Sequence, residues 1–98
     1  MHVAATGYAQ VQRLLPQNAK RGELVGQQYV FPLVQINNKV MKLAPGGLIF
    51  DQNNRTILHG YLPPYADVLY TIDTNGQVAR IYILTPQEQL MLDRAGPR

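Results

Sequence analysis

The chain has 98 residues, of which 46% are hydrophobic and 15% charged, and its formal net charge is +3. This composition is globular, since disordered chains are less apolar and more strongly charged, and the length suffices for one domain with a modest core. The lack of cysteine excludes disulfides, thiol nucleophiles and cysteine-based metal sites. No apolar run approaches the roughly 18 residues of a membrane-spanning helix, so no membrane span is predicted.

Residues 1–20 are predicted to form a flexible or partly helical segment. Several Gln and Asn residues interrupt its hydrophobic pattern. Ala9–Leu15 can form only one or two helical turns, because a proline follows and disfavours helix in the residue before it. Isolated turns of this length are marginal in water, so this segment would need to dock onto something else.

Residues 21–98 are predicted to form a single β domain built from hairpins. Two strand-like stretches come first, at Leu24–Val25 and Tyr29–Phe31. Three hairpins follow, each with turn residues that tolerate positive φ: Leu33–Ile36 with Lys39–Leu43, Leu48–Phe50 with Arg55–His59, and Val68–Ile72 with Gln77–Leu84. The Gly- and Pro-rich segments between hairpins, Ala44–Gly47 and Gly60–Ala66, are predicted to be loops.

The third hairpin has two open registers around Asp73–Gly76. A two-residue Asn-Gly loop pairs Tyr70 with Ile81 and gathers the apolar side chains on one face, which usually decides the register. A three-residue loop with a bulge pairs Tyr70 with Arg80 instead. The position of the aspartate before the glycine slightly favours this second register.

A helix is predicted from about residue 86 to 94. Thr85 is its N-cap, a proline follows at the first helical position, and Glu88 completes a capping box. Leu90 and Met91 are expected to face the sheet. Together these elements predict a mainly β fold, a small antiparallel β-barrel or β-roll of about six or seven strands in hairpins with a short C-terminal helix.

The residue inventory contains no catalytic set. The chain has neither serine nor cysteine, so the usual activated nucleophiles are missing. Turns and the helix cap explain three of the six acids, which leaves Glu23, Asp67 and Asp93 for acid–base chemistry. His59 with Asp67 is the one conceivable metal-binding pair, and two ligands do not make a zinc site. The sequence therefore predicts a protein that is not an enzyme and has no metal or cofactor.

The most unusual stretch is residues 59–65 (HGYLPPY). Its two tyrosines are suited to anchoring an interface, and its Pro-Pro step makes a stiff loop that loses little entropy on binding. With two residues of the third hairpin, the predicted binding patch consists of His59, Tyr61, Tyr65, Arg80 and Tyr82. The alternative, which we favour over a binding patch, is that these rings cap one end of the barrel and fill its small core.

Two functions are consistent with these features. The first is a non-catalytic protein-interaction or structural module with a protein partner or with self-association through exposed strand edges. The alternative is an SH3-like or OB-like barrel that binds nucleic acid or another polyanion, with bases stacked on tyrosines beside Arg55 and Arg80. Nucleic acid is the less favoured partner, because the basic residues are scattered and only Lys20 and Arg21 are adjacent.

Three motifs follow one another between Leu14 and Glu88: LLPQNAKRGEL, VQINNKVMKLAPGGLIFDQNNRTILHG and YTIDTNGQVARIYILTPQE. This segment resembles an uncharacterised family of small exported proteins of Gram-negative bacteria. The resemblance implies a periplasmic or secreted location in the cell envelope. It also implies that the Ala-rich start (VAATGYAQ) lies near a processed N-terminus, since no intact signal peptide is recognised there. It implies no catalytic residue, because the family offers none.

Overall fold

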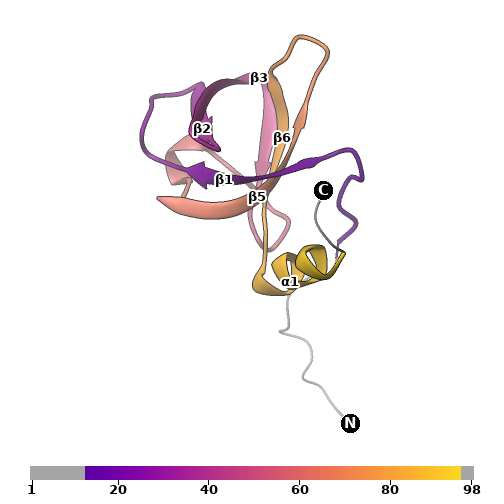
Figure 1. Ribbon diagram of the computed structural model, residues 1–98. Coiled ribbons are helices and arrows are strands. Elements are labelled where there is room, and N and C mark those ends of the chain that lie inside the picture. The colour runs from indigo at the N-terminus through magenta and orange to yellow at the C-terminus, as the bar shows by residue number, and fades with distance from the viewer. Residues whose placement is uncertain (1–12, 96–98) are drawn as a thin grey trace.

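The computed structural model describes residues 13–95, which form one sheet and one helix (Figure 1). The mainly β class that the sequence predicts is confirmed. No helix within residues 13–95 has the length and apolar character to cross a bilayer. The elements in chain order are β1 (Lys20–Val25), β2 (Leu33–Ile36), β3 (Lys39–Phe50), β4 (Thr56–Ile57), the 3-10 turn η2 (His59–Tyr61), β5 (Tyr65–Ile72), β6 (Val78–Ile83) and α1 (Pro86–Arg94).

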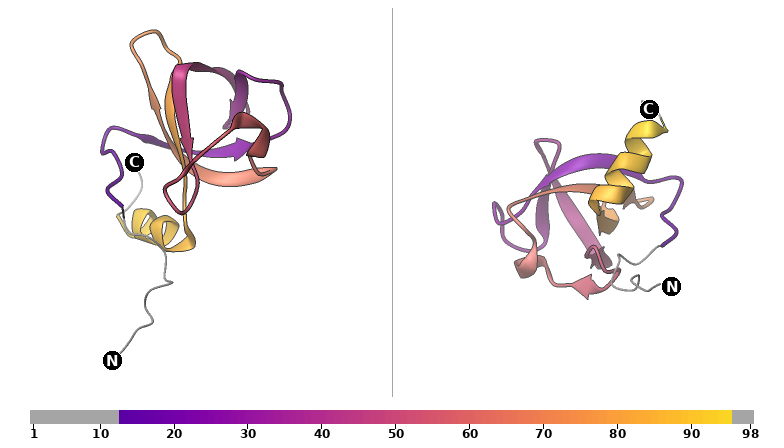
Figure 2. Two further views of the ribbon diagram at one scale, coloured as in Figure 1. Left: turned by 180° about the vertical axis from the view of Figure 1, so that it is seen from behind. Right: turned by 90° about the horizontal axis from the view of Figure 1, so that it is seen from below.

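The sheet is mixed, and its strand pairings close on themselves. β1, β2 and β3 form an antiparallel meander, and the β5–β6 hairpin joins it through an antiparallel β1–β5 pair and a parallel β3–β6 pair. Five strands therefore form a ring, seen from two further sides in Figure 2, and β4 adds to the end of β3. The prediction of a purely antiparallel arrangement is wrong at β3–β6, because hairpin signals specify only neighbours in sequence.

The first two predicted turns form. Asn37 and Asn38 both have positive φ, 54° and 65°, and make a two-residue turn between β2 and β3. In the second turn the Asp51 carboxylate accepts the backbone N–H groups of Asn53 and Arg55. Asn54 closes this turn in the left-handed conformation, with φ of 64°, as Asn does at lower cost than most residues.

The third hairpin combines the two predicted registers. The Asp73 backbone N–H donates to the Gln77 carbonyl, so the loop has three residues. Beyond the turn Ala79 is an extra residue on β6, and Tyr70 then pairs with Ile81. Turn chemistry therefore fixes the loop, and a bulge restores the register that buries the apolar face of β6.

β3 continues through Ala44–Gly47, where the sequence predicted a loop. Leu43 pairs with Val78 and Leu48 with Arg80, so these four residues stand opposite Ala79 alone. Such a bulge tolerates a proline and a left-handed glycine within a strand. The loop prediction is wrong, because Pro-Gly punctuation marks a bulged strand as well as a chain reversal.

Other predicted boundaries also change. Tyr29–Phe31 is not a strand but part of the exposed loop between β1 and β2. β4 has only two residues, where the sequence predicted Arg55–His59. Residues 1–12 of the predicted N-terminal segment, including most of Ala9–Leu15, lie outside the described residues, and residues 13–15 are not helical.

The hydrophobic core fills the inside of the ring. The most deeply buried members of the core cluster are Leu24, Ile36, Leu62, Val68, Val78 and Ile81. Tyr70 belongs to this core, and it is the one buried tyrosine in the described part of the chain. The other tyrosines of the described residues are at least partly exposed to solvent.

α1 begins as predicted but packs differently. Thr85 and Glu88 form the capping box, each side chain accepting the other's backbone N–H. Leu90 and Met91 are largely exposed, and no residue of the helix is buried, so the prediction that they face the sheet is wrong. The helix lies past one end of the ring rather than over its face (Figure 1), so polar contacts rather than apolar burial must hold it.

Candidate functional site

Exposed apolar side chains gather where the β1–β2 loop meets η2. We call this surface the apolar end and define it by its exposed members: Val30, Phe31, Leu58, Tyr61 and Tyr65. Tyr61 and Tyr65 expose 74% and 79% of their surface. Figure 1 shows the loop, η2 and the start of β5 on the same side of the ring. Exposed apolar residues scattered singly are normal, but grouped ones mark interaction surfaces.

Hydrogen bonds hold the two segments of the apolar end together. The Gly26 N–H donates to the Pro64 carbonyl at 3.0 Å, and the Gln27 amide donates to the Leu62 carbonyl at 2.7 Å. His59 Nε2 lies 2.6 Å from the Leu33 carbonyl, and the Phe31 ring meets the His59 ring edge-on at 5.7 Å. The apolar side chains therefore project from a backbone that is fixed at several points.

The structure separates the five predicted binding residues into two groups. Tyr61 and Tyr65 belong to the apolar end, and the alternative that these rings fill the core does not hold for them. His59 is half-buried and contacts Phe31, in the β1–β2 loop, and Leu33, at the start of β2. Arg80 and Tyr82 lie apart, on the outward side of β6.

Sequence reasoning missed the contribution of the β1–β2 loop and of Leu58. The sequence predicts a strand at Tyr29–Phe31, and the side chains of a strand would alternate between core and solvent. The neighbouring proline was the available signal, since it ends a strand and leaves the preceding apolar residues in a loop. The sequence around Leu58 gives no sign that this leucine is exposed rather than buried.

Tyr82 has a structural role on the outside of the sheet. Its ring stacks on Phe50 with 4.9 Å between centroids and 10° between planes. The guanidinium carbon of Arg13 lies 5.8 Å from the centroid of the Tyr82 ring, within the range of a cation–π contact. The contacts with Phe50 and Arg13 therefore hold the Tyr82 ring within the fold. Arg80, its neighbour on the same side of β6, donates a hydrogen bond to the carbonyl of Ala79.

Arg13 joins four parts of the structure. Its side chain is only 3% exposed and forms a bidentate ion pair with Glu88, at 2.9 Å and 3.0 Å. It also donates to the carbonyls of Asp51 and Ile83, both at 2.7 Å. The N-terminal segment, the second turn, the end of β6 and α1 therefore meet at one guanidinium. The sequence around Arg13 does not predict this role, because its partners are distant in sequence.

The Arg13–Glu88 pair should make stability depend on pH. Burial alone would raise the pKa of Glu88, but hydrogen bonds from Arg13 and Thr85 and the charge of Arg13 lower it below 4.5. The stabilisation is therefore present above pH 4.5 and is lost as the pH falls through the lowered pKa. Between about pH 6 and about pH 3, urea denaturation should show a greater loss of stability in the wild type than in Glu88→Gln. Equal pH dependence in the two proteins would contradict this role.

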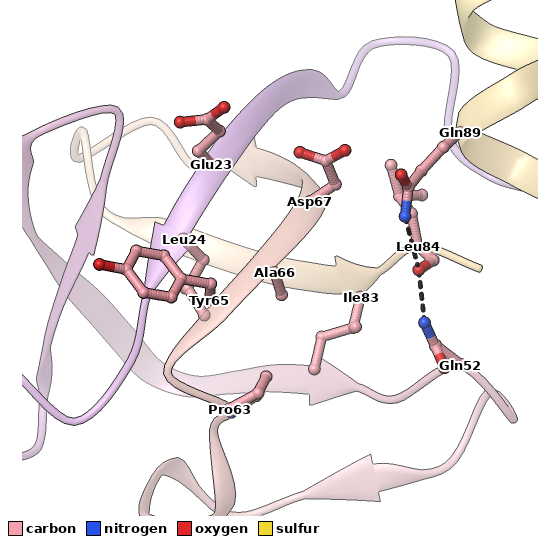
Figure 3. Close-up of a pocket in the computed structure, with 10 residues that line it drawn as sticks. All are labelled: Glu23, Leu24, Gln52, Pro63, Tyr65, Ala66, Asp67, Ile83, Leu84 and Gln89. Carbon is pink, nitrogen blue, oxygen red and sulfur yellow. Dashed lines mark hydrogen bonds between the residues drawn. The ribbon is translucent and has the colours of Figure 1, made fainter. Parts of the chain in front are cut away.

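A hollow of about 550 Å³ opens beside the start of β5 (Figure 3). Its lining residues are Glu23, Leu24, Gln52, Pro63, Tyr65, Ala66, Asp67, Ile83, Leu84 and Gln89. Figure 3 shows the carboxylates of Glu23 and Asp67 side by side at one rim, with the Tyr65 ring at another. Glu23 and Asp67 face each other across the β1–β5 pair.

The hollow does not assemble a catalytic or metal-binding set from the candidates of the sequence. Glu23 and Asp67 line it, but His59 does not. Within residues 13–95, no group of three or more potential metal ligands lies together. Asp67 accepts a hydrogen bond from Arg21 at 3.3 Å, which leaves Glu23 as the carboxylate of the hollow that faces only solvent.

Comparisons with protein-family models, with curated proteins and with solved structures give no match to this chain. The site must therefore be interpreted from its own geometry.

Proposed function

We propose that this chain is a non-catalytic binding module that contacts a protein partner through the apolar end. The observation that carries the proposal is the grouping of exposed apolar side chains on two segments that hydrogen bonds fix together. Aromatic side chains on a fixed backbone lose little entropy on binding and are the residues that most often dominate interface energies. The partner would present apolar side chains to Phe31 and Tyr61.

Site-specific photo-crosslinking tests this proposal. A photoreactive amino acid at Leu58 should give a discrete protein adduct in envelope extract, and the same group at Asn75, on the exposed third turn, should give none. Tyr61→Ala should lower the adduct yield about tenfold. Because Tyr61 is exposed, its replacement should change the free energy of unfolding by less than about 0.5 kcal/mol.

Leu14→Ala is the matched control, because Leu14 is also exposed and apolar but does not belong to the apolar end. It should leave the adduct yield unchanged. Equal adducts from Leu58 and Asn75, or equal losses in the two alanine variants, would contradict the proposal.

Two further parts of the proposal rest on the sequence. The absence of catalysis is supported by the lack of serine and cysteine and by the placement of His59 outside the hollow that holds Glu23 and Asp67. The periplasmic or secreted location is supported by the family resemblance of residues 14–88. Cell fractionation tests the location, and recovery of the protein in the cytoplasm would contradict it.

The order of strand pairings favours one alternative, an OB-like module that binds nucleic acid or another polyanion. A three-stranded meander closed by a hairpin through one parallel pair is the arrangement of an OB-type barrel, whose loops between strands bind oligonucleotides. A labelled single-stranded oligonucleotide should then bind at low salt, and Arg55→Ala with Arg80→Ala should weaken this binding. No binding at low salt would exclude this alternative.

A further inference from the structure

Gln27, in the β1–β2 loop, has a backbone conformation that is unusual for its residue type. Its φ is 67°, in the left-handed region that is unfavourable for most residues with a Cβ atom. The other residues with positive φ between residues 13 and 95 are all asparagine or glycine: Asn37, Asn38, Gly46, Asn54 and Gly76. The geometry of the turn alone would therefore favour asparagine or glycine at position 27, and the glutamine must serve another purpose.

The Gln27 side chain reaches across to η2. Its Nε2 atom donates to the Leu62 carbonyl at 2.7 Å and, more weakly, to the Gly60 carbonyl at 3.4 Å. A carboxamide nitrogen carries two N–H groups, so it can serve both acceptors. These two carbonyls belong to the residues on either side of Tyr61. Asparagine would suit the backbone better, but its side chain is one methylene group shorter and would not span this distance.

η2 has little support of its own. It has three residues, none of them buried, and no side-chain hydrogen bond caps its first turn, and isolated turns of this length are marginal in water. His59 ties the first residue of η2 to the Leu33 carbonyl. Gln27 ties the other end, where Tyr61 exposes 74% of its surface. Without Gln27, the backbone on both sides of Tyr61 would lose its side-chain donor.

The unfavourable conformation of Gln27 is consistent with a role in binding. Such conformations persist only where the surrounding structure compensates for them, and they concentrate at functional sites. Here the compensation would be a Tyr61 that is already ordered when a partner arrives, since ordering a side chain or loop on association weakens binding. The asparagine turns carry no member of the apolar end, and there the chain uses a residue that tolerates positive φ.

We infer that Gln27 is a positioning residue of the apolar end, and that its carboxamide holds Tyr61 in place for the protein partner at the expense of an unfavourable backbone conformation. This inference rests on the proposed function. Its consequence is that stability and binding respond differently to a change at this residue. A residue that only stabilised the fold would change both together.

Gln27→Asn in the full chain tests the inference. The melting temperature should stay within about 4 °C of the wild type, because relief of the backbone conformation offsets the lost hydrogen bonds. In NMR relaxation measurements on the free protein, the backbone order parameter of Tyr61 should fall from about 0.85 to below about 0.6. The yield of the Leu58 crosslink should fall about fivefold, because the partner must then order Tyr61 on binding.

Gln27→Glu separates the hydrogen bonds from the backbone conformation. Glutamate has the length of glutamine, but its ionised carboxylate cannot donate to the two carbonyls. It should loosen Tyr61 as Gln27→Asn does, and it should melt at a lower temperature than Gln27→Asn because the unfavourable φ remains.

Gln28→Asn is the matched control, because it makes the same chemical change at the next residue of the same loop. The Gln28 side chain is exposed and forms no hydrogen bond or ion pair with any residue of the described range. This variant should match the wild type in melting temperature, in the order parameter of Tyr61 and in crosslink yield.

Three results would overturn the inference: an unchanged Tyr61 order parameter in Gln27→Asn, an equal fall in Gln28→Asn, or a loosened Tyr61 with full crosslinking. The proposed function fails separately, because the order parameters are measured without a partner. If the wild type gave no Leu58 adduct, the apolar end would not be a binding surface, and the inference would fall with it even if Gln27 ordered Tyr61. An adduct that persists in Gln27→Asn would remove only the role of Gln27.

Discussion

Arg13→Ala should lower the free energy of unfolding by about 3 kcal/mol, because it breaks a mostly buried ion pair from one side. Glu88 would lose both guanidinium contacts, and the carbonyls of Asp51 and Ile83 would lose their donors. Urea denaturation measures the total loss. Native-state hydrogen exchange locates it, and the amides of Glu88 and Gln89 should show the largest loss of protection, since α1 buries no residue of its own.

Two variants control for charge and for geometry. Arg94→Ala removes the same charge from the exposed end of α1 and should change stability by less than about 0.5 kcal/mol. Arg13→Lys keeps the charge but cannot form the bidentate contact, so its loss should fall between those of the two alanine variants. If Arg13→Ala were as stable as Arg94→Ala, the joining role of Arg13 would be wrong.

Gly26→Ala should destabilise the fold by about 2 to 3 kcal/mol through overpacking. A Cβ atom at this position would lie 2.1 Å from the Pro63 carbonyl oxygen and 3.0 Å from the Leu62 Cβ. The nearest atom belongs to the backbone, so relief requires the β1–β2 loop to move away from residues 62–64. Circular dichroism melts measure the loss, and the Leu58 crosslink should weaken in parallel because the two segments of the apolar end separate.

Gly60→Ala is the matched control for this prediction. It lies in η2, close to the same contacts, but a Cβ added there meets nothing within 4 Å. Its stability should match that of the wild type within about 0.5 kcal/mol. If Gly26→Ala behaved in the same way, the close approach of the two segments would not be required.

The parts of the fold that are local in sequence could be predicted. Asn37-Asn38, Asp51–Asn54 and Asp73–Gly76 determine their own turns, since side chains of these residues hydrogen-bond to the nearby backbone or tolerate positive φ. The capping box at Thr85 is local in the same sense. Because these signals act within a few residues, neighbouring hairpins do not alter them.

The parts that depend on distant segments could not be predicted. The parallel β3–β6 pair and the continuous course of β3 depend on how two hairpins meet in space. The role of Arg13 depends on a partner 75 positions away along the chain. The candidate site divides in the same way. The stiff loop that holds Tyr61 and Tyr65 is visible in the sequence, whereas Phe31 and Glu23 join the site only through contacts of the folded chain.

The parallel pair between β3 and β6 also determines when the protein can finish folding. Leu48 pairs with Arg80, and the β5–β6 hairpin must enter between β1 and β3 before the ring closes. Contacts of such long sequence separation slow folding. A nascent chain that ends before β6 has the meander but not its closing partner, so two strand edges and the inner apolar face stay uncovered. Aggregation during synthesis should therefore depend on how quickly the last third of the chain becomes available.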